Sequence, residues 1–414
     1  MNTRKDITEV FTPRRGEVNP SMYVDRPSLE TELYRSVKRY SHTLLFGESG
    51  NGKSWLYKKV LYENHVPYVV ANCGNSSRLK SITTEIFNCL IEPGTAKKLG
   101  FTDEKSAELN AYFATGGLKH NGQYELAQEE PLLAAFRVFG ESSNGKKIIV
   151  LDNLEFIFNS TELMDELANI LVLLDDQRYS KYDVNVLIVG TPYNVMKYFR
   201  ETKNVESVAN RIEEMQKVSG LDSGQTMEIV KKGFSQLNVP IVGETLIHLS
   251  NHVWNVTLGI AQRIHEYCES LAYEIQDNSW KYSKNLLDKA DLKWLLQGLR
   301  QSYQAIETHL NSRETTVARK NQVIYCIGKM RVHQFDANVI DGMIRKEFPT
   351  TIPKTNMGIF KILSELSQGD TPIISLDKKT NSFSVIDPRY LMCIRVALFK
   401  DAKQGKVQKK QFLR

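Results

Sequence analysis

The chain has few cysteines, and none stands in a spacing typical of a metal or redox site. The five are scattered over 414 residues without a C-x-x-C pair, at Cys73, Cys89, Cys268, Cys326 and Cys393. We therefore interpret them as buried or incidental thiols rather than zinc ligands or disulfides. The eight histidines form no H-E-x-x-H motif, which argues against catalytic zinc and nuclease chemistry.

Long apolar runs are also lacking. No run approaches the roughly 18 residues of a membrane-spanning helix, and the N-terminus, Met1-Asn-Thr-Arg-Lys-Asp6, has no apolar signal-peptide core. We therefore expect a protein of the cytoplasm, or the nucleus, without membrane contact. The formal charge of +6 allows contact with nucleic acid but does not require it. The length suits two or three domains.

One glycine-rich stretch stands out between a short apolar run and a helical pattern. It fills G-x-x-x-x-G-K-[ST] without a mismatch and consists of Gly47, Glu48, Ser49, Gly50, Asn51, Gly52, Lys53 and Ser54, followed by Trp55. Such a loop turns backbone N–H groups toward the β- and γ-phosphates, and the following helix adds its positive dipole end. Lys53 should reach the terminal phosphates, and Ser54 should take one Mg²⁺ position. The pattern predicts a nucleoside triphosphate site.

A P-loop needs an acid at the end of a neighbouring strand, and the run Ile148–Leu151 delivers Asp152 there. The next residue is Asn153, which cannot accept a proton from the attacking water. If this residue limits the rate, a glutamate at 153 should accelerate hydrolysis. Otherwise Glu155 takes the role of base. The plainer interpretation of Glu155 is an acid at a helix start.

Four further residues are candidates for contact with phosphate. Thr191 ends the apolar run 184–191 and could touch the phosphate or the water, or simply cap the next helix. Arg211 and Arg263 could face phosphate, including the phosphate of a neighbouring subunit. Arg200 competes with Arg211. Each arginine is otherwise a surface residue of a helix.

Strands alternating with helices predict a parallel sheet covered on both faces, an α/β P-loop fold. The expected parts are an extended arm at 1–27, the core at 28–193 with an insertion at about 92–130, a helical lid at 194–312, a domain at 313–400 and a basic tail at 401–414. We expect only helices between 194 and 312, including one at 206–213. In the last domain, helices precede two short strands within 372–387, the pattern of a winged helix.

This order of motifs resembles the AAA+ ATPases of the origin-recognition initiator and TniB/MuB transposition-regulator kind, which grade into STAND-type ATPases. The lead-in YVDRPSLETELYRSV is similar to the start of those domains. The resemblance covers roughly 20–275 and 315–400. It implies that ATP and Mg²⁺ bind at 47–54, with Ser54 and Asp152 at the metal. It also implies that Thr191 is the first sensor and Arg211 the finger that bridges subunits.

Two positions depart from the family pattern. Asp152-Asn153 replaces a pair of acids, and the lid arginine, usually three residues after the glycine, is Arg263 beside Gln262. The resemblance implies a slow ATPase whose nucleotide state controls homo-oligomerisation and contact with double-stranded DNA or a partner protein. The alternative is the ATPase of a prokaryotic antiviral-defence system that acts with a separate effector. The winged helix offers few cations for DNA, mainly Lys361, Lys378 and Lys379. A basic tail is most often solvated and mobile, but contact of this tail with a polyanion would add to those cations.

Overall fold

The computed structural model describes residues 4–90, 130–191, 208–310, 317–332, 334–401 and 406–410. It divides into two compact units, which we treat separately. A sheet unit comprises Gly16–Val18 and Asp25–Ser219, and a helical unit comprises Met1–Arg15, Asn19–Val24 and Gly220–Arg414. No helix within these described ranges is both long and apolar enough to cross a membrane. Residues 92–129 of the expected insertion at about 92–130 lie outside the described residues, and so do residues 194–207 at the start of the expected helical lid, which include Arg200.

The sheet unit is built on five parallel strands in the order β2-β3-β4-β1-β5. These are β1 (His42–Phe46), β2 (Tyr68–Asn72), β3 (Lys147–Asp152), β4 (Val184–Gly190) and β5 (Ile212–Glu214). The strands β1, β3 and β4 are mostly apolar and almost wholly buried, as expected of a parallel sheet covered on both faces. The predicted α/β architecture is confirmed.

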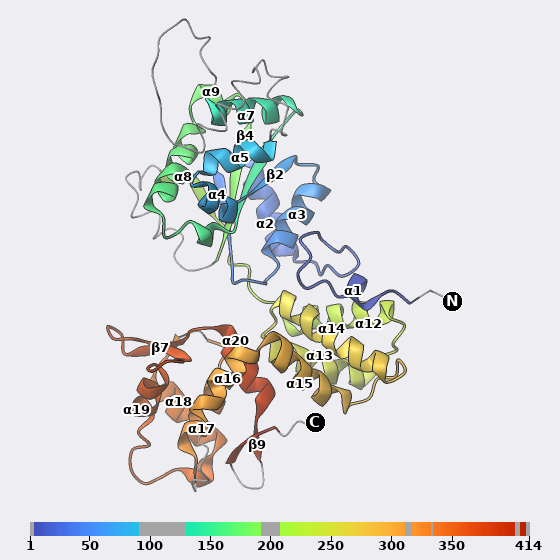
Figure 1. Ribbon diagram of the computed structural model, residues 1–414, viewed down its shortest axis with the longest axis vertical. Coiled ribbons are helices and arrows are strands. Elements are labelled where there is room, and N and C mark those ends of the chain that lie inside the picture. Colours follow the sequence, from blue (N-terminus) through green and yellow to red (C-terminus); the bar gives the residue numbers. More distant parts are fainter. Residues whose placement is uncertain are drawn as a thin grey trace, which may run out of the picture. The chain divides into compact units, whose positions relative to one another are not determined.

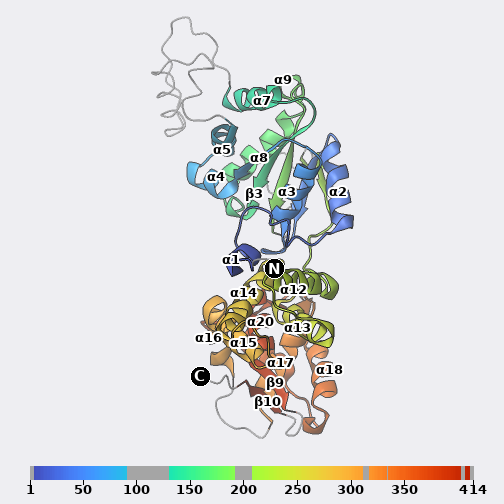
Figure 2. The same cartoon turned by 90° about the vertical axis from the view of Figure 1, so that its right-hand side faces the viewer.

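Alternate side chains of the strands enter two separate cores. Ile148 and Val150 pack with α2 (Pro27–Lys38) and α3 (Lys53–Glu63). Ile149 and Leu151 pack on the other face. That face is covered by α5 (Ile82–Leu90), α7 (Pro131–Glu141) and α8 (Thr161–Leu173). The two helical layers are visible on either side of the sheet (Figure 2). The shorter elements are α4 (Cys73–Leu79), η2 (Leu154–Phe156) and α9 (Gln177–Ser180).

The buried apolar residues of the helical unit form one continuous core, and Figure 1 labels the main elements of this unit. Its first helices are α1 (Ile7–Val10), α12 (Ser223–Gln236), α13 (Gly243–Thr257), α14 (Ala261–Asp277), α15 (Leu286–Gly298), α16 (Arg300–His309) and α17 (Arg319–Lys329). Then come β6 (Gln334–Phe335), α18 (Ala337–Glu347), η3 (Pro349–Thr351), α19 (Ile359–Leu366), β7 (Ile374–Asp377), β8 (Ser382–Val385) and α20 (Pro388–Ala397). The last elements are β9 (Leu398–Asp401) and β10 (Lys406–Lys409).

The predicted hairpin within 372–387 is confirmed as β7 and β8, which pair antiparallel. β6 adds a third strand beside β8. The sequence did not predict β6, because a strand of two residues leaves no recognisable pattern. Arg395 of α20 ties this region to the helices before it. Its guanidinium donates to the carbonyl oxygens of Gly328 at 2.6 Å, Met330 at 2.7 Å and Asn255 at 2.7 Å. These carbonyls lie at or just beyond the C-terminal turns of α17 and α13, where helices leave acceptors unpaired.

Three sequence expectations were wrong. The stretch 206–213, expected as a helix within the lid that begins at 194, contains the start of β5, which pairs with β1. The arm at 1–27 is not simply extended, because it forms α1 and buries Phe11 and Met22 in the helical core. The tail at 401–414 is not simply solvated, because β10 pairs with β9. Two of its lysines form ion pairs, Lys409 with Glu307 and Lys410 with Asp288 and Asp291.

Candidate nucleotide-binding site

The loop between β1 and α3 has the backbone of a phosphate cradle. Gly50 and Gly52 adopt φ values of 83° and 85°, a region that residues with a Cβ rarely enter. Gly47 is constrained differently, since a Cβ there would lie 2.3 Å from the carbonyl oxygen of Val218. α3 begins directly after the loop at Lys53, so its unpaired N–H groups and positive dipole end belong to the cradle.

Lys53 lies over the loop that precedes it. Its Nζ donates to the carbonyl oxygens of Gly47 at 2.7 Å and Glu48 at 3.1 Å. Burial lowers the pKa of Lys53, while the charges of Glu155, Asp152 and Glu48 oppose that shift. A lysine so placed needs only a side-chain rotation to exchange the two carbonyl acceptors for phosphate oxygens.

Asp152 receives three hydrogen bonds at the end of β3. Its Oδ2 accepts from the Ser54 hydroxyl at 3.2 Å and from the Tyr57 hydroxyl at 3.0 Å, and its Oδ1 accepts from the backbone N–H of Asn153 at 2.9 Å. Burial, together with the Asp152 carboxylate, raises the pKa of Tyr57 well above its ordinary value. The structure thus brings the two predicted metal residues together and adds Tyr57 to them.

The residues after Asp152 turn the chain sharply. Asn153 has φ 62° and ψ 46° and precedes η2. This left-handed conformation suits asparagine better than most residues. The turn leads to Glu155, whose Oε2 is buried and has no hydrogen-bond partner among the described residues. Since Glu155 also acts electrostatically on Lys53, its carboxylate belongs to the candidate site.

Thr191 follows the last residue of β4, beside the loop. Phe46 and Gly190 are in register, and the N–H of Gly47 donates to the carbonyl oxygen of Gly190 at 3.3 Å. A Cβ at Gly190 would lie 4.0 Å from Glu155 Oε2. Thr191 and Glu155 therefore occupy the same edge of the sheet as the loop.

A segment that follows β5 braces the loop, and sequence reasoning missed it. Lys217 forms an ion pair with Glu48. Asn51 Nδ2 donates to Glu48 Oε2 at 2.8 Å and to the Val218 carbonyl oxygen at 3.0 Å. Through these contacts Glu48 and Asn51 fix the loop to the segment after β5. Ser49 is exposed and Trp55 is half-buried. No local motif marks the segment, although Tyr57 could have been noticed, because it stands three residues after Ser54 on the same helix.

Each of the two candidate arginines has an acidic partner within its own unit. Arg211 precedes β5 and donates through Nε to Asp175 Oδ2 at 2.6 Å, and its carbonyl oxygen accepts from the N–H of His42, the first residue of β1. It therefore lies at the edge of the sheet opposite the loop, about 16 Å away at 3.3 Å per residue. Arg263 belongs to α14 of the helical unit and pairs with Glu266 at 2.6 Å.

The residues present fit a magnesium ion bound together with a nucleotide. The described chain holds no group of three or more His, Cys, Asp or Glu that could bind a metal. Magnesium beside phosphates needs fewer protein ligands, because phosphate oxygens and waters complete its shell. Ser54 and Asp152 are the pair that suits this role. His248 and His252 stand one turn apart on α13, but His252 Nε2 lies 2.8 Å from Asp291 Oδ1, so the pair offers no free metal site.

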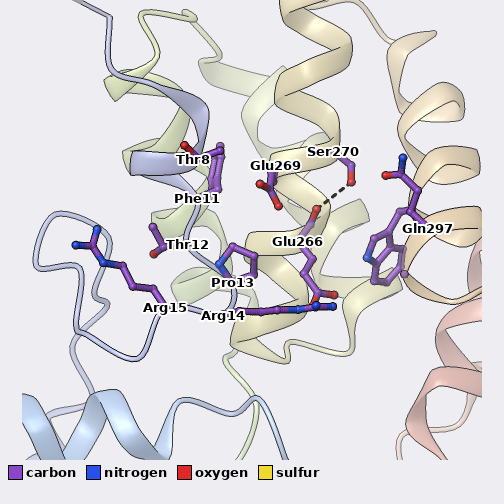
Figure 3. Close-up of a pocket in the computed structure, with 12 residues that line it drawn as sticks. Thr8, Phe11, Thr12, Pro13, Arg14, Arg15, Glu266, Glu269, Ser270 and Gln297 are labelled. Carbon is purple, nitrogen blue, oxygen red and sulfur yellow. Dashed lines mark hydrogen bonds and ion pairs between the residues drawn. The ribbon is translucent and has the colours of Figure 1, made fainter.

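A separate cavity of about 480 Å³ lies in the helical unit (Figure 3). Two arginines and two glutamates contribute to its lining, Arg14, Arg15, Glu266 and Glu269. Arg14 Nε lies 4.0 Å from Glu266 Oε1, and burial beside Glu266 raises the pKa of Glu269. This mixture of charges defines no single class of ligand.

Taken together, the sheet, its flanking helices and the loop define an α/β P-loop fold of the AAA+ type. Residues 36–199 match the family model described as AAA domain. The Walker-type ATPase PABY2304 of Pyrococcus abyssi is similar in structure, at 16% identity and a TM-score of 0.50, over 92% of this chain and 99% of that chain.

Two solved structures from Aeropyrum pernix also match. The ORC2 protein in its ADP form has 14% identity and a TM-score of 0.49, over 94% of this chain and 96% of that chain. The ORC1 protein in complex with DNA has 13% identity and a TM-score of 0.45, over 94% of this chain and 95% of that chain. No curated protein matches the chain.

Proposed function

We propose that this chain is an AAA+ ATPase that binds ATP and Mg²⁺ at residues 47–54 and acts as a slow switch in the cytoplasm. The observation that carries the proposal is the meeting of Lys53, Ser54, Asp152 and Glu155 at one edge of the sheet. The similar Pyrococcus abyssi protein is itself a Walker-type ATPase.

The chain's own residues divide the work. Backbone N–H groups of the loop and of the first turn of α3 bind the phosphates, and Lys53 pairs with the terminal ones. Ser54 and Asp152 would hold Mg²⁺, which would supply positive charge to neutralise the phosphates. Glu155, with a buried oxygen in want of a donor, accepts the hydrogen bond of the attacking water. Thr191 orients that water or the γ-phosphate.

Lys53→Ala tests the site. Nucleotide hydrolysis should vanish and ATP affinity should fall, because the mutation removes the ammonium group that the carbonyl oxygens of Gly47 and Glu48 hold over the loop. Lys58→Ala is the matched control, since Lys58 lies on the same helix but donates to the Gly16 carbonyl oxygen. Turnover that survives in Lys53→Ala at the wild-type rate refutes the assignment.

The position of Arg211 supports a proposal of assembly. Arg211 lies at the edge of the sheet opposite its own loop, so a nucleotide that it contacts would belong to a neighbouring copy. We therefore include in the proposal a homo-oligomer in which Arg211 completes the next subunit's site. Arg263 remains a proposed contact for nucleotide from the helical unit. Light scattering on size-exclusion fractions should show a larger particle with ATP than without, and Arg211→Ala should lose the difference.

For the C-terminal part, we propose a winged helix that contacts double-stranded DNA. Its support is the order α17, α18, α19 followed by β7 and β8, with β6 completing the sheet. α19 and the β7–β8 turn would face DNA with Lys361, Lys378 and Lys379. The tail no longer supports this contact as the sequence suggested, because its lysines 409 and 410 pair within the protein.

A second candidate is the ATPase of an antiviral-defence system that docks a separate effector protein. It is favoured by Phe360, an apolar side chain of α19 that is 46% exposed and that a protein partner would cover. Electrophoretic mobility shifts on double-stranded DNA, with and without ATP, separate the two. Binding that falls with salt and with Lys378→Ala/Lys379→Ala supports DNA contact. Absence of any shift in both nucleotide states excludes it.

A further inference from the structure

Tyr57 connects the helix of the phosphate loop to the acid at the end of β3. Its side chain is wholly buried and packs edge-on against Tyr68, with ring centroids 6.3 Å apart. From this fixed ring the hydroxyl reaches Asp152 Oδ2 at 3.0 Å. The phenol is thus held by packing in an orientation that aims its proton at the carboxylate.

The bonds on Asp152 differ in what nucleotide binding would do to them. The Asn153 N–H is part of the backbone, so its 2.9 Å bond to Oδ1 persists. The Ser54 hydroxyl, 3.2 Å from Oδ2, is a metal ligand in the proposed function and must turn its oxygen toward Mg²⁺. Tyr57 is therefore the side-chain donor that can keep Oδ2 in place throughout. Groups that orient metal-binding carboxylates in this way commonly change metal affinity 10- to 100-fold when removed.

We propose that Tyr57 is a positioning residue of the magnesium half of the site. Its hydroxyl fixes the side-chain rotamer of Asp152 so that the carboxylate meets Ser54 and the metal. This inference rests on the proposed function, because it assigns a role within the same site. A purely structural Tyr57 would satisfy its buried hydroxyl on the nearest acceptor, and its loss would affect folding but not the dependence on Mg²⁺.

The test compares Tyr57→Phe with Tyr62→Phe, since Tyr62 lies on the same helix but is 78% exposed. Binding of a fluorescent ATP analogue is measured in EDTA and over a Mg²⁺ titration, with thermal unfolding recorded for each variant. Tyr57→Phe should raise the Mg²⁺ concentration at half-effect about 10- to 100-fold and leave binding in EDTA unchanged. Tyr62→Phe should match the wild type. A Mg²⁺ titration of Tyr57→Phe that coincides with the wild type overturns the proposal, whatever the unfolding temperature.

A double-mutant cycle gives a second, independent readout. In an Asp152→Asn background the carboxylate that Tyr57 would position is gone, so Tyr57→Phe should change the Mg²⁺ dependence less than about twofold. An additional loss as large as in the wild-type background contradicts action through Asp152. If the wild-type protein binds no ATP, the proposed function itself fails, and Tyr57 fails with it. If the wild type binds ATP in a Mg²⁺-dependent way and both tyrosine variants behave alike, only the Tyr57 inference fails.

Discussion

Replacement of Glu155 by glutamine should remove the base from the proposed reaction while keeping its shape. Glu155 Oε2 is buried without a partner in the described chain, which is costly for a carboxylate. A water positioned for attack would supply the missing donor. General-base assistance contributes typically 10²- to 10⁴-fold, so the variant should lose about 3–5 kcal/mol of transition-state stabilisation. The turnover number carries this loss.

A measurement of ATP affinity distinguishes the loss of the base from general damage to the binding site. The charge of Glu155 acts on Lys53, and its removal makes the loop less negative, so Glu155→Gln should bind ATP as tightly as the wild type or more tightly. Glu162→Gln, an exposed acid at the start of α8, should change neither quantity. Single-turnover hydrolysis and equilibrium binding measure the two effects. Wild-type turnover in Glu155→Gln refutes the assignment of the base.

The backbone conformation of Asn153 determines what the variant Asn153→Glu should show. A glutamate at 153 would have to adopt φ 62°, which costs a residue with a Cβ about 1–2 kcal/mol, whereas asparagine is among the residues that tolerate it. Asn153→Glu should therefore reduce stability and bring no faster hydrolysis. A clear gain in turnover would show that position 153, and not 155, limits the reaction.

Two further predictions concern stability. Arg395→Met should lower the free energy of unfolding of the helical unit by about 3 kcal/mol, because three charged hydrogen bonds to helix-end carbonyls are lost. The control Arg389→Met, on the same helix, should lower it by less than about 1 kcal/mol. Denaturant titration measures both changes, and equal changes would contradict the argument. Burial lowers the pKa of His42 and of His265 from 6.5 to about 4. Between pH 6.5 and pH 4 the unfolded chain therefore binds more protons than the folded chain. Each histidine should thus lower the free energy of unfolding by roughly 3 kcal/mol as the pH falls through this range. Urea titrations at several pH values should show that the free energy of unfolding depends less steeply on pH in His42→Gln than in the wild type. An equally steep dependence would contradict the argument for His42.

The sequence predicted the sheet and its loop because both rest on local patterns. Four apolar residues before Asp152 are typical of a buried strand in a parallel sheet. The glycines at 50 and 52 indicate the positive φ values that the loop adopts. β5 escaped because it has three residues with two glutamates and owes its conformation to pairing with β1. A strand held by its neighbour rather than by its own apolar residues leaves no periodic signal.

The misjudged tail shows the same limit for charge. Lys409 and Lys410 sit in a stretch with few acids nearby in sequence, which favours a solvated tail. In the fold their partners come from residues more than a hundred positions earlier, Glu307 and Asp291. Asp291 is buried and also accepts from Tyr267 at 2.6 Å, so Lys410 compensates a charge that would otherwise be costly inside the core. A basic run therefore indicates a polyanion partner only after the buried acids of its own chain have been counted, and here that count weakens the case for DNA.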